Sequence, residues 1–133
     1  EGDEEDLSVE NFMKAYKKKC NEYNCDVSKI IKGQFEVFLD EGKEISKLHM
    51  WEELGWPGVK AIVEALKSVA YPHLRSIRLW KTYCEDEGVR SICSFLDRNA
   101  SVICLELLDD KVTPLGCEFI GRTLTPGPSC PPI

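Results

Sequence analysis

The sequence contains few of the residues from which enzyme and metal sites are built. Only two of its 133 residues are histidines, and its seven cysteines form no Cys-x-x-Cys pair. Its nine glycines are scattered, so they form no glycine-rich phosphate-binding loop. No apolar run approaches the roughly 18–20 residues of a membrane-spanning helix. These absences argue against a zinc site, a nucleotide site and a membrane span, and we predict no cofactor, no metal and no membrane contact.

The histidines and the paired carboxylates offer no catalytic arrangement. His49 falls on a predicted strand and His73 follows Pro72 in a connection, and neither has a cysteine or carboxylate at metal-ligand spacing. The pairs Glu52–Glu53 and Asp109–Asp110 come directly after predicted strands. Acid–base catalysis would require a cleft that shifts their pKa values, and we expect solvated loops instead. We therefore predict that the protein is not an enzyme.

The balance of charge favours protein partners over nucleic acid. The formal net charge is −6, and Lys17–Lys19 forms the only cluster of basic residues. Phosphate backbones bind basic faces, so we predict no nucleic-acid partner. Three lysines on one helical turn are typical of a solvated helix face.

The cysteines favour a reducing compartment. Their number is odd, which leaves no closed set of disulfides. Several of them occupy apolar positions, where a free thiol behaves as a small hydrophobic side chain. We therefore predict a cytoplasmic protein.

An acidic tail and a helical cap are predicted for the first 44 residues. Residues 1–6 include five carboxylates and are expected to be disordered. Residues 7–44 begin with a helix for which Ser8 is a suitable N-cap, with Leu7 and Phe12 as a hydrophobic staple. The apolar residues of this helix recur every three or four positions and form one stripe, made of Val9, Phe12, Met13, Tyr16, Cys20 and Tyr23.

A second, shorter helix around Ile30–Ile31 should follow and end at Gly33. The run Phe35–Leu39 is apolar, and periodicity alone leaves both helix and strand open for it. We interpret residues 7–44 as an N-terminal cap, because the first unit of a repeat array would otherwise expose its apolar flank to water.

Three similar units follow, at residues 45–73, 74–101 and 102–124. Their first residues lie 29 and 28 positions apart. Each unit has apolar residues at its first, fourth and sixth positions, then a glycine, then apolar residues one, four and eight positions after that glycine. Unit by unit, these residues are Ile45, Leu48, Met50, Gly58, Val59, Ile62 and Leu66; Leu74, Ile77, Leu79, Gly88, Val89, Ile92 and Leu96; and Val102, Leu105, Leu107, Gly116, Cys117, Ile120 and Leu124.

The spacing within each unit predicts one strand followed by one helix. Side chains at positions four and six point to the same side of a strand. The apolar residues after the glycine lie on one face of a helix. Neither element can bury its apolar side alone, so we expect the units to stack with their strands parallel.

These units resemble leucine-rich repeats, in particular those of the ribonuclease-inhibitor type, over about residues 45–124. The resemblance implies an α/β fold: a short leucine-rich-repeat solenoid with parallel strands on its concave face. The chain departs from the family just after each strand, where Glu53, Thr82 and Asp110 replace the usual asparagine or cysteine. Threonine and aspartate can still bond the local backbone, whereas Glu53 would do so poorly.

The cap carries a further resemblance. Tyr16 and Cys20 lie four residues apart on a helix, and a short apolar helix and the repeats follow. This order is similar to that of several intracellular leucine-rich-repeat proteins, some of which are associated with cilia and flagella. The resemblance implies a cytoskeletal setting such as an axoneme.

The candidate binding site consists of the strand positions that point away from the core. If positions four and six face inward, positions five and seven face outward, and strands about 4.8 Å apart would set them side by side on the concave face. Exposed aromatic surface rimmed by polar groups is typical of a protein contact site. The alternative is that both tryptophans fold under the adjacent loops and complete the core. The residues are His49, Arg78 and Glu106 at position five and Trp51, Trp80 and Leu108 at position seven.

The last unit predicts an open flank. Residues 125–133 contain four prolines and should form an extended or disordered tail. Three units are about the minimum for a stable stack, and no amphipathic cap follows the third. We expect the apolar flank around Val102, Leu105 and Ile120 to be covered by the tail, by another chain or by further repeats, and we favour the last two.

We conclude from the sequence that the chain is a non-catalytic protein–protein interaction or scaffold module, with a ciliary or flagellar axoneme as the setting implied by resemblance. The alternative is a cytosolic inhibitor or regulatory sensor that binds one enzyme. A basic enzyme would suit a chain whose net charge is −6.

Overall fold

The structure is a computed structural model that describes residues 7–99, 101–124 and 132. The acidic segment 1–6 lies outside the described residues, as does all of segment 125–133 except residue 132, so their predicted disorder stays a prediction. The elements in chain order are α1 (Ser8–Tyr23), α2 (Lys29–Glu41), β1 (Lys47–Met50), α3 (Gly55–Ser68), β2 (Ser76–Trp80), α4 (Glu85–Leu96), β3 (Cys104–Leu108) and α5 (Pro114–Thr123).

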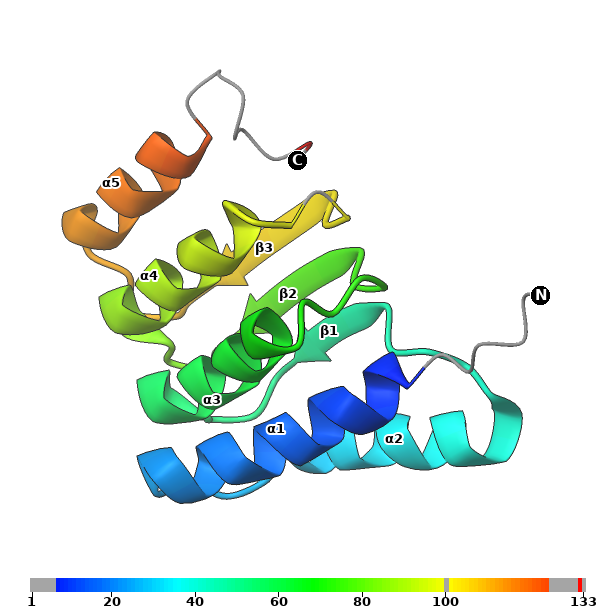
Figure 1. Ribbon diagram of the computed structural model, residues 1–133. Helices are drawn as coiled ribbons and strands as arrows, with labels where there is room; N and C mark the ends of the chain where they lie inside the picture. Colours follow the sequence, from blue (N-terminus) through cyan, green and yellow to red (C-terminus); the bar gives the residue numbers. More distant parts are fainter. Residues whose placement is uncertain (1–6, 100, 125–131, 133) are drawn as a thin grey trace.

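The fold is α/β, as the sequence predicted. The strands form one parallel sheet in the order β1-β2-β3, and α3, α4 and α5 lie along one side of it (Figure 1). The register pairs equivalent positions of consecutive units: Leu48 lies opposite Ile77, and Ile77 lies opposite Leu105. Each strand is followed by its own helix, which packs against the helix of the neighbouring unit.

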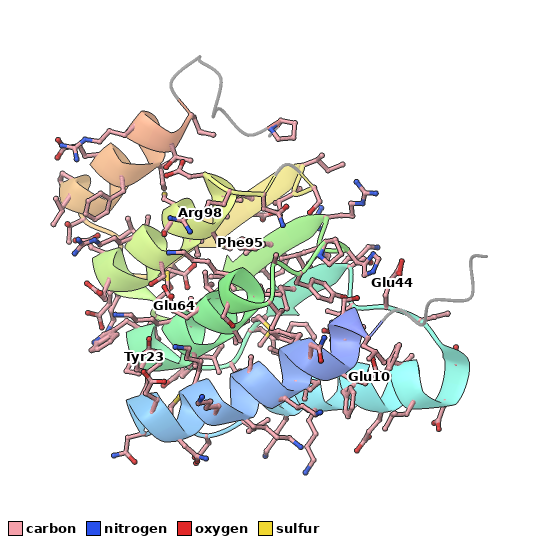
Figure 2. All side chains as sticks on the ribbon, viewed as in Figure 1. Glu10, Tyr23, Glu44, Glu64, Phe95 and Arg98 are labelled. Atoms are coloured by element: carbon pink, nitrogen blue, oxygen red, sulfur yellow. The ribbon has the colours of Figure 1, made fainter. Side chains whose placement is uncertain are left out.

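The predicted core positions of the first two units are buried between the sheet and the helices (Figure 2). The glycine that recurs in each unit lies in the first turns of its helix, where space is short. A Cβ on Gly58 would lie 2.9 Å from Cβ of Leu54, and one on Gly88 would lie 2.6 Å from Cβ of Cys84. Glycine therefore recurs because the side chain four residues earlier packs against that backbone.

The third unit is buried less than the sequence predicted. Leu105, Leu107 and Ile120 are only half-buried, and Cys117 and Leu124 are exposed. The reason is position: β3 is an edge strand, and α5 packs against α4. Two residues of the expected open flank, Leu105 and Ile120, are half-buried, and what covers them stays a prediction. The flank does not include Val102, which is fully buried.

Helix α1 covers the first unit. Its predicted apolar stripe packs against α3 and is buried from Val9 to Cys20, whereas Tyr23 is only half-buried. The prediction that Ser8 is the N-cap is wrong by one residue. Leu7 takes that place, because its carbonyl accepts the first helical hydrogen bond, from the backbone N–H of Asn11 at 2.8 Å.

Helix α2 is longer than predicted, because Gly33 does not end it. The hydroxyl of Ser28 caps its start by accepting from the N–H groups of Ile30 and Ile31. The helix continues through Phe35–Leu39 and ends at Gly42, whose φ of 73° is left-handed. One interior glycine costs a helix only about 1 kcal/mol, which the packing of apolar residues beyond it can offset.

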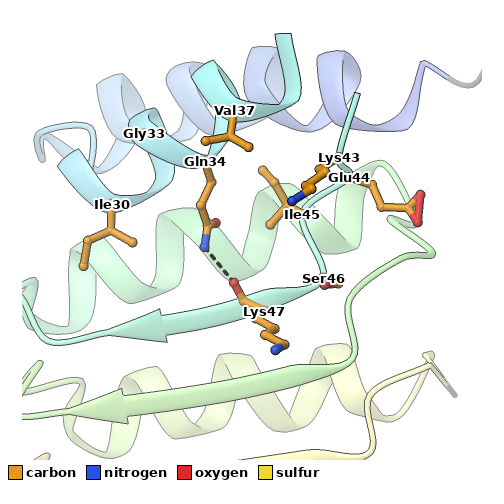
Figure 3. A pocket seen from close by; sticks show the side chains of 9 residues that line it. All are labelled: Ile30, Gly33, Gln34, Val37, Lys43, Glu44, Ile45, Ser46 and Lys47. Atoms are coloured by element: carbon orange, nitrogen blue, oxygen red, sulfur yellow. Dashed lines mark hydrogen bonds between the residues drawn. The ribbon is translucent and has the colours of Figure 1, made fainter. Parts of the chain in front are cut away.

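Helix α2 also runs beside the outer edge of β1 (Figure 3). Its Gln34 side chain donates from Nε2 to the carbonyl of Lys47 at 2.9 Å. At the helix start, Glu52 accepts from the Ser28 hydroxyl and, at 3.3 Å, from the N–H of Lys29. These bonds tie α2 to the first unit and satisfy a backbone group that an edge strand would leave unpaired.

Candidate protein-binding face

One side of the sheet carries none of the helices α3, α4 and α5, and we call it the open face (Figure 1). The strand positions that point away from the core lie on it. The register sets His49 opposite Arg78, Arg78 opposite Glu106, and Trp80 opposite Leu108. Trp51 follows the last residue of β1 directly. The structure thus brings the six residues of the predicted site together on one face.

The aromatic and apolar members of the open face are exposed. Trp51 is 67% exposed, Trp80 43% and Leu108 52%. The indoles therefore do not fold under the neighbouring loops, which was the alternative reading of these two residues. A row of large apolar side chains in water is the kind of surface on which protein contacts form. That a partner binds there stays a prediction.

Glu106 connects two of the other residues of the face. Its Oε2 accepts from the indole Nε1 of Trp80 at 3.1 Å, and its Oε1 lies 3.5 Å from Nε of Arg78. Because the charged pair is nearly half exposed, it contributes at most about 1 kcal/mol to stability. The main effect of Glu106 is to restrict the rotamers of Trp80 and Arg78. The sequence predicts that these residues are neighbours but not that they bond, because the bonds depend on side-chain rotamers.

His49 lies in a locally positive environment. Its Nε2 is 3.0 Å from the hydroxyl of Ser76. Burial lowers the pKa of His49 below its usual value, and the positive charges of Arg78 and Lys47 lower it further, while Glu106 acts in the opposite direction. The imidazole is therefore neutral at pH 7.

His73 takes no part in the open face. It lies in the connection after α3, where its Nδ1 is 3.4 Å from a carboxylate oxygen of Glu44 and its ring meets that of Tyr71 edge-on at 5.5 Å. Within residues 7–99 and 101–124, no group of three or more His, Cys, Asp or Glu side chains is placed to hold a metal ion. His73 thus has one carboxylate neighbour, Glu44, and lies apart from the residues of the open face.

A small hollow opens between the two tryptophans of the open face. It measures about 140 Å³ and is lined by His49, Met50, Trp51, Arg78 and Trp80. A cavity of about 150 Å³ is large enough to hold benzene. The hollow therefore has the size of one apolar side chain, and it has a cation at its margin.

The carboxylates that follow the strands are not all solvated, which corrects the prediction for Glu52 and Asp110. Glu52 is half-buried and bonds the start of α2. Asp110 is buried, and its Oδ1 accepts from the N–H and hydroxyl of Thr82, both at 2.8 Å. Asp110 thus joins the loops of the second and third units just beyond Trp80. Glu53 and Asp109 are exposed, as predicted.

Buried thiols contribute to packing rather than to chemistry. Burial raises the pKa of Cys20 to about 11 and that of Cys84 to about 12, and it also raises the pKa of Cys93. These thiols stay protonated at neutral pH and are poor nucleophiles.

In the described part of the chain, no helix is both long and apolar enough to cross a bilayer.

Comparisons with known proteins do not identify the chain. A scan against protein-family models finds no match, and a search of curated proteins finds none either. The functional assignment therefore depends on the geometry of the open face.

Proposed function

We propose that the protein is a non-catalytic protein–protein interaction module, built as a short leucine-rich-repeat solenoid of the ribonuclease-inhibitor type, whose open face binds the partner. The observation that carries the proposal is the exposed set of Trp51, directly after β1, Trp80 at the end of β2 and Leu108 at the end of β3. Tryptophan and arginine dominate the binding energy of protein interfaces. A rigid sheet presents them with little loss of conformational freedom on binding.

Support for the repeat architecture comes from bonds that recur between consecutive units. The backbone N–H of Gly55 donates to the carbonyl of Thr82 at 2.8 Å, and that of Glu85 donates to the carbonyl of Asp110 at 2.9 Å. The left-handed φ of Lys81 recurs at Asp109, its counterpart in the next unit. Such repetition is what a solenoid requires, since each unit contacts only its neighbours.

The setting is proposed by resemblance. The cap followed by repeats of this type suits a scaffold of a ciliary or flagellar axoneme in the cytoplasm. Within that setting the protein would hold a partner by surface contact, without turnover and without a cofactor.

A capture experiment with matched tryptophan variants tests this function. The purified protein is immobilised and exposed to an extract of ciliated cells, and bound proteins are identified by mass spectrometry. We expect Trp51→Ala/Trp80→Ala to lose the main partner at least about tenfold, with little change in melting temperature. The control is Trp56→Ala, which removes a partly exposed indole from α3. Equal capture by the double variant, or loss only in the control, would show that the open face is not the site.

The alternative function, an inhibitor or sensor of one basic enzyme, is supported by the net charge of −6. Long-range attraction of this kind speeds association and is screened by salt. An association rate that falls steeply between low and physiological ionic strength, with a basic protein as the captured partner, would favour the inhibitor. A rate that hardly changes would favour the scaffold.

A further inference from the structure

We propose that the open face recognises an acidic segment of its partner, with one apolar side chain of that segment seated in the hollow between Trp51 and Trp80. The inference rests on the proposed function and specifies the chemistry of the partner. It differs from the expectation that net charge alone suggests, because a chain of charge −6 would favour a basic partner.

Arg78 is the cation that lines the hollow, and Lys47 lies on β1 two residues before His49. Lys47 is exposed and forms no ion pair with a described residue, and Arg78 has one ion pair in the described part of the chain, from Nε to Glu106. Glu106 belongs to β3 and already accepts from Trp80. Among the described residues, the open face thus carries two cations, Lys47 on β1 and Arg78 on β2, and one carboxylate, Glu106 on β3, which pairs with Arg78 alone. A partner carboxylate could pair with the remaining positive charge.

The charges close to the hollow affect a bound group more strongly than the net charge of the whole chain does. The Debye length is about 8 Å at physiological ionic strength, so distant surface carboxylates are screened from a group bound at the hollow. Of the carboxylates that follow β1 and β3, Glu52 is held by the start of α2 and Asp110 is buried against Thr82. Glu53 and Asp109 are exposed in the loops beyond the strands. An acidic segment would therefore lie along the strands, on the side of Lys47 and Arg78.

The hollow supplies the apolar part of the recognition. Trp51, Trp80 and Met50 are among the residues that line it, and its volume is about 140 Å³. One leucine- or phenylalanine-sized side chain seated there would take apolar surface of both tryptophans out of water. An acidic residue beside that side chain would reach the guanidinium of Arg78, which also lines the hollow.

His49 makes the binding sensitive to pH. The groups that face it are Arg78, Lys47, Glu106 and the hydroxyl of Ser76. Its pKa in the free protein is below the usual value, and a bound carboxylate would raise it. His49 would then be protonated more often in the complex than in the free protein, so the affinity increases as pH falls from 8 toward 6, while the partner carboxylates remain ionised.

Indole NMR signals of the intact chain provide the test. The chain contains three tryptophans, so Trp56 on α3 serves as an internal reference for Trp51 and Trp80. Three short capped peptides are titrated: glutamates with a central leucine, lysines with the same leucine, and glutamates with serine in its place. We expect the glutamate–leucine peptide to shift the Trp51 and Trp80 signals and to bind at least about tenfold more tightly than either other peptide.

Two arginine variants complete the experiment. Arg78→Gln should weaken the glutamate–leucine peptide about tenfold. Arg98→Gln removes the same charge from an exposed residue beyond α4, far from the open face (Figure 2), and should leave the affinity unchanged.

The proposal is overturned if the lysine peptide binds more tightly, if Trp56 shifts as much as the other two indoles, if no peptide shifts them, or if Arg78→Gln has no effect. A basic partner that Trp51→Ala/Trp80→Ala fails to capture would overturn this inference and leave the proposed function standing.

Discussion

The first and third units, at the two ends of the stack, differ in how far their apolar residues are exposed to solvent. At the first unit, α1 lies across α3 and buries Phe12 and Tyr16, and α2 bonds the outer edge of β1. At the third unit, Leu107 on β3 and Ile120 on α5 are only half-buried. A groove of about 440 Å³ lies there, lined in part by these two residues and Val112.

The difference shows that a repeat motif does not by itself determine burial. Ile62, Ile92 and Ile120 hold the same position in successive units, four residues after the glycine. The first two are buried because another helix lies on each side of their own, whereas Ile120 has α4 on one side only. Stability in such an array is a sum of neighbour contacts, so the third unit should be the weakest.

The largest expected effect is at the covered end. Phe12→Ala removes a ring that is fully buried and lies 5.8 Å from Tyr16 and 5.7 Å from Tyr71 between ring centroids. We expect it to lower the free energy of unfolding by about 3–5 kcal/mol, measured by urea denaturation. Leu39→Ala, at an exposed position of α2, should change it by less than about 0.5 kcal/mol. Similar losses in both would mean that α1 does not cover the stack as described.

A matched pair of isoleucines compares the middle with the open end. Ile92→Ala should lower the free energy of unfolding by about 2–5 kcal/mol, because it leaves a cavity between covered units. Ile120→Ala should cost less than about 1.5 kcal/mol, because its side chain is already half in water. Urea denaturation of both variants measures the difference. If Ile120→Ala proved as costly as Ile92→Ala, the third unit would have to be covered in solution.

The smallest expected effect concerns the attachment of α5. Asp86 accepts from the N–H of Thr113 at 2.8 Å and from its hydroxyl, and these bonds hold the pKa of Asp86 below its usual value. A lowered carboxyl pKa stabilises the fold above the unfolded pKa of about 3.9, and that stability is lost as pH falls through the lower folded value.

We therefore expect the Cα chemical shifts of α5 to lose helical character on acidification before those of α1 do. Asp86→Asn should reduce the helical character of α5 at neutral pH and remove this acid-dependent step. An α5 that is equally helical in Asp86→Asn and in the unchanged protein at neutral pH would show that the Asp86 bonds do not anchor it.

Several features of the fold were predictable because they depend on neighbours along the chain. The α1 stripe, the three strand–helix units and their parallel register follow from spacing, since side chains two apart on a strand, or three to four apart on a helix, share a side. The length of α2 was not predictable in this way. Gly33 is a usual end signal, and only the contacts beyond it decide that the helix continues to Glu41.

Part of the candidate site could likewise be predicted from the sequence, and part of it could not. That Trp51, Trp80 and Leu108 share a face could be predicted from alternation alone. That the indoles are exposed could not, since a loop that folds back would have covered them with the same sequence pattern. The bond from Trp80 to Glu106 and the role of Asp110 as an acceptor between units required the side-chain rotamers and the loop geometry.

Period and alternation along the chain are sufficient to establish a cap followed by three stacked strand–helix units, because these depend on local backbone geometry. The tertiary structure decides which copy of a repeated side chain is buried, which carboxylate is bonded and which surface stays open. The physical reason is that the burial of a side chain and its electrostatic environment depend on the residues that pack against it. In this chain, residues such as Asp110 and Glu106 make those contacts with another unit.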